Sequence, residues 1–87
     1  MDTSAKLTPT IVIYSSPTCG FCHMAKQYLK DKGYSFTEKD ISVDQEALQF
    51  VLHNVGQAVT PIISINDKIV VGFDRPSLDA ALNENSK

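Results

Sequence analysis

The chain has 87 residues, of which 43% are hydrophobic and 21% are charged, so it predicts one small domain of ordinary soluble composition over residues 1–87. Its 8 Lys and Arg residues are outnumbered by 10 Asp and Glu residues, which argues against the basic face of a nucleic-acid binder. No apolar run approaches the roughly 20 residues that span a bilayer, and the first six residues lack the apolar segment of a secretory signal. We therefore expect a cytoplasmic monomer without membrane contact.

The first third of the chain predicts a strand followed by a helix. Residues 1–9 are polar and are expected to form a frayed start. The β-branched run Thr10–Tyr14 predicts a buried, central strand with a parallel neighbour. Helical spacing of apolar residues begins at Cys19, with Thr18 as the expected N-cap and Gly33 as the expected residue just past the helix end.

The middle third predicts a second strand and a second helix. Tyr34–Ile41 alternates between apolar and polar residues well enough for a strand. Ser42 or Asp44 can cap the helix that follows, and Gly56 is expected to end it. The apolar stripe of this helix consists of Ala47, Leu48, Val51, Leu52 and Val55.

The last third predicts a hairpin and a third helix. Two short apolar runs, Pro61–Ile65 and Lys68–Val71, are joined by the tight-turn dipeptide Asn66–Asp67. A helix over Pro76–Leu82 has its proline in the first turn, where the missing N–H costs nothing. Asn83–Lys87 is expected to be a polar tail.

The resulting order β-α-β-α-β-β-α predicts an α/β fold with a four-stranded mixed β-sheet flanked by three helices. Helical crossovers favour parallel pairing of the first two strands and right-handed connections. The last two strands form an antiparallel hairpin. The structured core is expected to cover residues from about 10 to 83.

The two cysteines of the chain, Cys19 and Cys22, are separated by only two residues. A secreted disulfide scaffold would carry more cysteines, spread widely along the chain. A bridge that closes so short a loop stabilises the fold little. In a reducing cytosol, such a pair is therefore expected to be catalytic, redox-sensing or metal-binding.

The position of this pair at the junction of a strand and a helix favours redox catalysis. A cysteine at a helix N-terminus faces unpaired N–H groups and the positive end of the helix dipole, which lower its pKa from about 8.5 to roughly 3.5–7.5. Cys19 can then attack a substrate disulfide, and Cys22, one turn further on, can resolve the mixed disulfide. Cys22 is expected to be less exposed and less acidic than Cys19.

The dipeptide Thr60–Pro61 stands at the start of the third predicted strand. The plain interpretation is a proline at a strand's first residue, where no ladder hydrogen bond is lost. With a C-x-x-C motif upstream, a cis peptide bond that faces the cysteines becomes the better hypothesis.

The sequence from Ile11 to Leu82 resembles the glutaredoxins, which have the thioredoxin fold. The matching segments are Ile11–Tyr14, Cys19–Cys22, Thr60–Pro61 and Gly72–Asp74. The resemblance implies a dithiol thiol–disulfide oxidoreductase that reduces protein disulfides or glutathione mixed disulfides. It implies glutathione as a co-substrate, a redox-active disulfide between Cys19 and Cys22, and no tightly bound cofactor or metal.

The resemblance also implies a set of binding residues. The backbone of Thr60, beside a cis Pro61, would pair with a bound peptide or with glutathione like an added strand. The other implied residues are Phe21 and Gln57, which line the groove, and Gly72, Phe73 and Asp74, which border the γ-glutamyl end of glutathione. Asp74 fits the N-cap of the last helix equally well.

Five residues depart from the family's pattern. Gly20–Phe21 stands where dithiol glutaredoxins usually have Pro-Tyr, and it is similar to the monothiol glutaredoxins. Ser16 replaces a basic residue that in many relatives helps to hold a glutathione carboxylate. Thr60 replaces the usual valine, and Val71 replaces the first residue of the usual Gly-Gly.

These departures leave two alternative functions open. The combination of Cys22–His23 with Gly72–Phe73 and Arg75 resembles redoxins that take electrons from thioredoxin reductase and pass them to ribonucleotide reductase. The Gly-Phe dipeptide instead supports a glutathione-assisted [2Fe–2S] cluster carrier that bridges two chains.

Two further metal hypotheses are weaker. The segment Cys19–His23 matches the haem-attachment pattern C-x-x-C-H, but an export signal and a distal ligand are lacking. A zinc site would need four ligands, and the fourth candidate, His53, lies on a different predicted helix.

Overall fold

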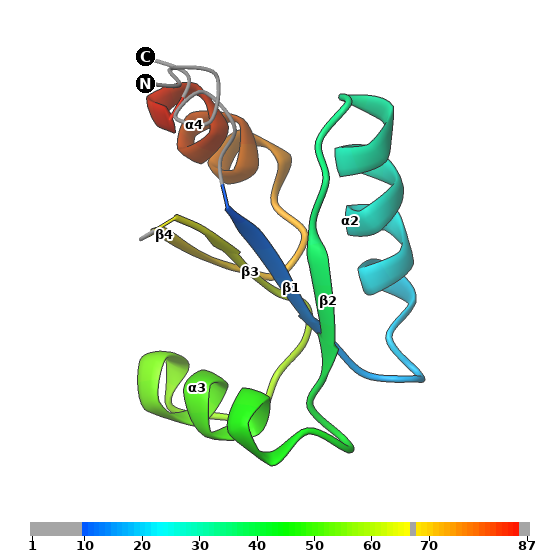
Figure 1. The fold of residues 1–87 in the computed structure, drawn as a ribbon, viewed down its shortest axis with the longest axis vertical. Helices are drawn as coiled ribbons and strands as arrows, with labels where there is room; N and C mark the ends of the chain where they lie inside the picture. Colours follow the sequence, from blue (N-terminus) through cyan, green and yellow to red (C-terminus); the bar gives the residue numbers. More distant parts are fainter. Residues whose placement is uncertain (1–9, 67, 86–87) are drawn as a thin grey trace, which may run out of the picture.

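The computed structural model describes residues 10–66 and 68–85. In chain order, the elements are β1 (Ile11–Ser15), α2 (Gly20–Asp31), β2 (Thr37–Asp40), α3 (Gln45–Val55), β3 (Ile62–Ile65), β4 (Lys68–Val71) and α4 (Arg75–Asn85) (Figure 1). This order and the four-stranded mixed sheet confirm the predicted fold class. Residues 1–9, expected to form a frayed start, lie outside the described residues.

The sheet has the strand order β2-β1-β3-β4, so β1 is a central strand as predicted. It pairs in parallel with β2 and antiparallel with β3, and β3 pairs antiparallel with β4. Ile13 of β1 lies opposite both Glu38 of β2 and Ile63 of β3. Because partners across a sheet share a face, this register directs Glu38 toward the same side as the buried Ile13.

The sheet separates two apolar layers, since successive strand residues point to opposite faces. Helices α2 and α4 cover one face and α3 covers the other (Figure 1). The first layer is formed by Ile11, Ile13, Ala25, Leu29, Ile63, Ile65, Val70, Leu78, Ala81 and Leu82. The second is smaller and is formed by Tyr14, Ala47, Val51 and Ile62. The helix that begins at the cysteine motif is thus fixed to the larger core.

Helix α2 differs from the prediction at its start and agrees with it at its end. The N-cap is Cys19 rather than Thr18, because the Cys19 sulfur accepts the N–H of Cys22. At the other end, Gly33 has a φ of +86°, which favours glycine. Gly33 N–H donates to Lys30 C=O, and Tyr34 N–H donates to Leu29 C=O, each at 3.0 Å. These bonds form a Schellman motif that ends the helix.

Helix α3 has the caps that the sequence predicts. The Asp44 side chain accepts the N–H of Ala47, and Gly56 ends the helix with a φ of +93°. The apolar stripe is narrower than predicted, since Leu52 is 40% exposed. Among the described helices, α3 alone covers this face of the sheet, so residues at the flank of its apolar stripe have no second described helix to pack against.

The hairpin and the last helix also show one agreement and one correction. Strands β3 and β4 pair as predicted, although Asp67 of the expected turn lies outside the described residues. Helix α4 continues to Asn85 instead of ending at Leu82, because no Gly or Pro follows Leu82 to stop it. The tail prediction for Asn83–Lys87 was therefore wrong up to Asn85, and residues 86–87 lie outside the described residues. Among the helices in the described ranges, none has the length and apolar character to cross a membrane.

Candidate active site

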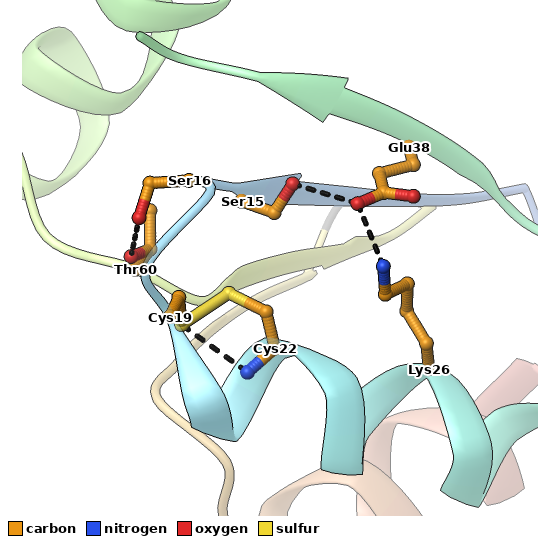
Figure 2. The surroundings of a disulfide bond; sticks show 7 residues. All are labelled: Ser15, Ser16, Cys19, Cys22, Lys26, Glu38 and Thr60. Atoms are coloured by element: carbon orange, nitrogen blue, oxygen red, sulfur yellow. Dashed lines mark hydrogen bonds and ion pairs between the residues drawn. A yellow bond between two sulfur atoms is a disulfide. The ribbon is translucent and has the colours of Figure 1, made fainter.

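Cys19 and Cys22 are joined by a disulfide, with their Cα atoms 5.3 Å apart (Figure 2). Cys19 is the N-cap of α2 and has an extended backbone, whereas Cys22 lies within the first helical turn. The Cys19 sulfur accepts the backbone N–H of Cys22 at 3.2 Å. A sulfur that is already positioned as acceptor at a helix N-terminus is in the environment that favours a thiolate.

The two sulfurs differ in their access to solvent. Cys22 is only 2% exposed and belongs to the buried set, whereas Cys19 is partly exposed. A molecule in solution can therefore reach the Cys19 sulfur without rearrangement of the fold. The Cys22 sulfur is shielded from solvent and is accessible to Cys19. This difference agrees with the order of exposure expected from the sequence.

The segment before β3 lies beside the cysteine motif. The Thr60–Pro61 peptide bond is cis, as hypothesised from the sequence, and Pro61 is buried. The hydroxyl groups of Ser16 and Thr60 lie within hydrogen-bond distance, at 3.2 Å (Figure 2). Cys19 N–H donates to Ser16 C=O at 3.2 Å. Ser16 thus links the cysteine loop to the residue that precedes the cis-proline.

The turn after β4 adjoins the same region. Gly72 N–H donates to Pro61 C=O at 2.8 Å, and Gly72 has a φ of +82°. Phe73 packs edge-on against Tyr28 of α2, with ring centroids 5.8 Å apart. A hydrogen bond thus joins Gly72 to cis Pro61, and the next residue, Phe73, packs against the second half of α2.

Two of the expected binding residues, Asp74 and Gln57, form no hydrogen bond with the cysteines in the described part of the chain. Asp74 C=O accepts the N–H of Leu78, so Asp74 occupies the N-cap position of α4, and its carboxylate accepts the Ser77 hydroxyl. Gln57 is exposed in the loop after α3. Within the described ranges, no hydrogen bond or ion pair links Gln57 or Asp74 to either cysteine.

A polar cluster beside the motif was not anticipated from the sequence. Glu38 accepts hydrogen bonds from Lys26 Nζ and from Ser15 Oγ, each at 2.9 Å (Figure 2). The hydrogen bond from Lys26, and to a smaller extent the one from Ser15, holds the pKa of Glu38 below its usual value. No local pattern identifies this cluster, because it depends on the β1–β2 register and on the rotation of α2 about its axis.

The candidate zinc ligands named from the sequence do not lie together. No three His, Cys, Asp or Glu side chains gather within the part of the chain that the structure describes. His23 is exposed on α2 and His53 lies on α3, on the opposite side of the sheet. The arrangement at the motif is therefore a dithiol pair with one accessible sulfur, beside a cis-proline edge.

Comparison with known proteins agrees with this arrangement. A family model described as Glutaredoxin matches residues 11–70. An uncharacterized glutaredoxin-like 8.6 kDa protein in the rubredoxin operon of Clostridium pasteurianum is 32% identical over 74 residues, which are 85% of this chain and 99% of that protein. Glutaredoxin 3 of Escherichia coli K12 is 33% identical over 64 residues, which are 74% of this chain and 77% of that protein.

A solved structure agrees as well. The crystal structure of the glutaredoxin from Methanosarcina mazei Go1 superposes with a TM-score of 0.76 at 25% identity, over 84% of this chain and 77% of that one. The family model, the relatives and the shared fold confirm the resemblance found in the sequence, and the chain belongs to the glutaredoxin family.

Proposed function

We propose that this protein is a dithiol thiol–disulfide oxidoreductase in which Cys19 is the nucleophile and Cys22 the resolving thiol. The observation that carries the proposal is the asymmetry of the pair. Cys19 caps α2 and is partly exposed, whereas Cys22 is buried one turn further on. A helix N-terminus favours the thiolate form of the capping cysteine, and the thiolate is the species that attacks disulfides.

The proposed cycle has two exchange steps. The Cys19 thiolate attacks one substrate sulfur, a Cys19–substrate disulfide forms, and the other substrate sulfur leaves as a thiolate. The Cys22 thiolate then attacks the Cys19 sulfur and releases the second substrate thiolate. The substrate gains two electrons, and the protein is left with the Cys19–Cys22 disulfide, which a reductant must reopen.

We propose that substrate binds along the edge formed by Thr60 and cis Pro61. Two hydrogen bonds hold this edge in place. One joins the hydroxyl groups of Ser16 and Thr60, and the other runs from Gly72 N–H to Pro61 C=O. The other proposed binding residues, carried over from the family resemblance, are Phe21, Gln57, Gly72, Phe73 and Asp74. Phe21 fits best, because it is 62% exposed and lies two residues after the proposed nucleophile.

The reductant is proposed to be glutathione, as the family implies, and one observation favours a second candidate. At Ser16, where many relatives have a basic residue, this chain has a neutral hydroxyl group that is bonded to Thr60. A glutathione carboxylate would find no cation at this position. This supports thioredoxin reductase as an alternative donor, with ribonucleotide reductase as a possible recipient of the electrons.

Because the dithiol must be returned to its reduced form, we propose that the protein works in the cytoplasm, where thiols are kept reduced.

The test is a side-by-side turnover assay. The oxidised protein is offered glutathione with glutathione reductase, and separately thioredoxin reductase, each with NADPH. Oxidation of NADPH in either arm that requires both the protein and a disulfide substrate supports the proposed activity. NADPH oxidation that persists in the Cys19→Ser variant would contradict the assignment of Cys19.

A further inference from the structure

Two open cavities follow one another along α2, starting at the cysteine motif. The first, of about 320 Å³, is lined by Gly20, Phe21 and Met24. The second, of about 380 Å³, is lined by Met24, Gln27, Tyr28, Asp31, Phe73 and Arg75. Met24 lines both cavities, so they are neighbours on the surface, and we call the two together the α2 groove. It begins at the residue that directly follows Cys19.

Exposed apolar side chains line much of the α2 groove. Phe21 is 62% exposed and Met24 is 50% exposed, and their spacing puts them side by side on the helix. Tyr28 and Phe73 continue this surface and pack against each other edge-on. Aromatic residues and methionine are enriched at the centres of binding surfaces, and the flexible thioether side chain of methionine adapts to different partners.

The length of the α2 groove distinguishes a polypeptide from a small thiol. Its lining residues extend from Gly20 to Asp31 on α2, which is about 16 Å along the helix axis. A tripeptide such as glutathione spans at most about 10 Å when extended, whereas five residues span about 17 Å. A small thiol can therefore reach Cys19 but cannot fill the groove.

The two charges at the far end of the groove are not equivalent. Asp31 already accepts a hydrogen bond from Gln27 at 2.8 Å. Arg75, on the opposite wall, takes part in neither of the ion pairs formed among the described side chains. A carboxylate on the occupant would find in Arg75 a cation with planar, bidentate geometry, whereas a lysine would have to compete with Gln27 for Asp31.

We infer that the α2 groove binds an extended, apolar segment of a protein substrate, with its reactive sulfur at Cys19 and an acidic side chain at Arg75. The inference rests on the proposed function, because the groove is useful only if Cys19 exchanges with the bound segment. It adds a substrate class, namely polypeptides with about five apolar residues on one side of the reactive cysteine.

Synthetic peptides test this inference directly. Each contains a Gly-Cys-Gly unit whose cysteine is bound to thionitrobenzoate as a mixed disulfide. One peptide is the unit alone. In the others, the unit is extended by five residues, which contain leucines and have a Glu at the end far from the cysteine. The extension is attached either at the N-terminal or at the C-terminal side of the unit. One reduced protein molecule converts one mixed disulfide into a peptide thiol and coloured thionitrobenzoate, while Cys19 and Cys22 form their disulfide. The rate of colour release in a single turnover is the measured quantity.

We expect the leucine-containing extension to react about tenfold faster than a Gly-Ser extension of equal length, in one chain direction. Replacement of the terminal Glu by Lys is expected to slow the reaction about two- to fivefold. Met24→Glu should remove the leucine advantage, because glutamate keeps the helix but adds a charge to the groove floor. Arg75→Glu should reverse the preference for Glu over Lys.

Two matched variants serve as controls. Lys30→Glu makes the same charge change as Arg75→Glu at an exposed α2 position that does not line the groove. Gln49→Glu makes the same charge change as Met24→Glu on α3, on the other side of the sheet. Both controls should keep the ratio of rates between the leucine and Gly-Ser peptides.

The possible failures are distinguishable. If every peptide is reduced at the same rate, the redox function stands and the groove proposal is overturned. If Met24→Glu separates a dimer in sedimentation while the wild-type protein does not discriminate between peptides, the groove is an interface between two copies, which also overturns the proposal. If no peptide is reduced, the proposed function fails, and the groove proposal fails with it.

Discussion

The hydroxyl groups of Ser16 and Thr60 lie 3.2 Å apart, and their contact joins the loop before Cys19 to the residue before cis Pro61. Both residues depart from the family's usual pattern, in which a basic residue and a valine stand at these positions. The two departures are thus in contact, and together they form a neutral, polar border next to Cys19. Because the border carries no cation, it offers no ion pair to a carboxylate of glutathione, which is the proposed reductant.

The first prediction concerns this border. If glutathione serves as reductant, Ser16→Lys should lower the KM for glutathione by about 1.4- to 5-fold, because an exposed ion pair with its carboxylate contributes about 0.2–1 kcal/mol. Steady-state assays with glutathione reductase measure the change. Ser16→Ala, which removes the hydroxyl group without adding charge, is the control and should not lower the KM. An unchanged KM in Ser16→Lys would show that no carboxylate binds near this position.

The second prediction concerns the acidity of Cys19 in the reduced protein. As the N-cap of α2, Cys19 should have a thiol pKa below the usual value of about 8.5. The rate of iodoacetamide alkylation, measured against pH and assigned to each cysteine by peptide mass mapping, reports this pKa. Cys22, which is buried, should react more slowly at every pH. Equal rates at the two cysteines would contradict the asymmetry on which the mechanism depends.

The third prediction compares two leucines that occupy helical apolar stripes. Leu29 is fully buried between α2 and the sheet, whereas Leu52 is 40% exposed on α3. Leu29→Ala should lower the free energy of unfolding by about 2–5 kcal/mol, because it removes buried area and leaves a cavity. Leu52→Ala should lower it by less than about 1.5 kcal/mol. Urea unfolding measures both, and equal losses would mean that the exposed flank of α3 is buried in solution.

The fourth prediction concerns the Glu38 cluster and pH. Because Lys26 and Ser15 lower the pKa of Glu38 in the folded state, the carboxylate contributes stability above its unfolded pKa of about 4.3. That contribution is lost as the pH falls through the lower, folded pKa. At neutral pH, Glu38→Gln should reduce the free energy of unfolding by about 0.2–1 kcal/mol, since the pair is partly exposed.

The same variant should lose its effect in acid. Below both pKa values, the wild-type carboxyl group is protonated and neutral like glutamine, so the two proteins should unfold at the same urea concentration. Lys26→Met is the reciprocal variant, and a double-mutant cycle isolates the pair from its surroundings. A stability difference that persisted unchanged at pH 3 would mean that charge on Glu38 is not its cause.

The elements that could be predicted from the sequence are those with local signals. Gly33 and Gly56 end their helices as expected, because a positive φ is a local requirement that glycine meets. The motif at Cys19 could be recognised because a strand, a turn and a helix start follow one another in the sequence. The cis bond before Pro61 followed from that motif rather than from the proline alone.

The features that could not be predicted depend on which elements meet in space. Leu52 lies on a regular apolar stripe, but its exposure is set by the number of helices on that face of the sheet. In the sequence, nothing distinguishes Glu38 from an ordinary strand residue, and only the β1–β2 register directs it toward Lys26. Likewise, Arg75 joins Phe21 in one groove only because the turn after β4 packs against α2.

The central claim is that Cys19 attacks the substrate disulfide and that Cys22 resolves the mixed disulfide between Cys19 and the substrate. The most direct measurement is trapping of the mixed disulfide with the Gly-Cys-Gly thionitrobenzoate peptide, followed by mass mapping of the modified cysteine. The account predicts that the Cys22→Ser protein accumulates an adduct on Cys19, and that the Cys19→Ser protein accumulates almost none. An adduct that formed on Cys22 of the Cys19→Ser protein at a comparable rate would contradict the assignment of the two roles.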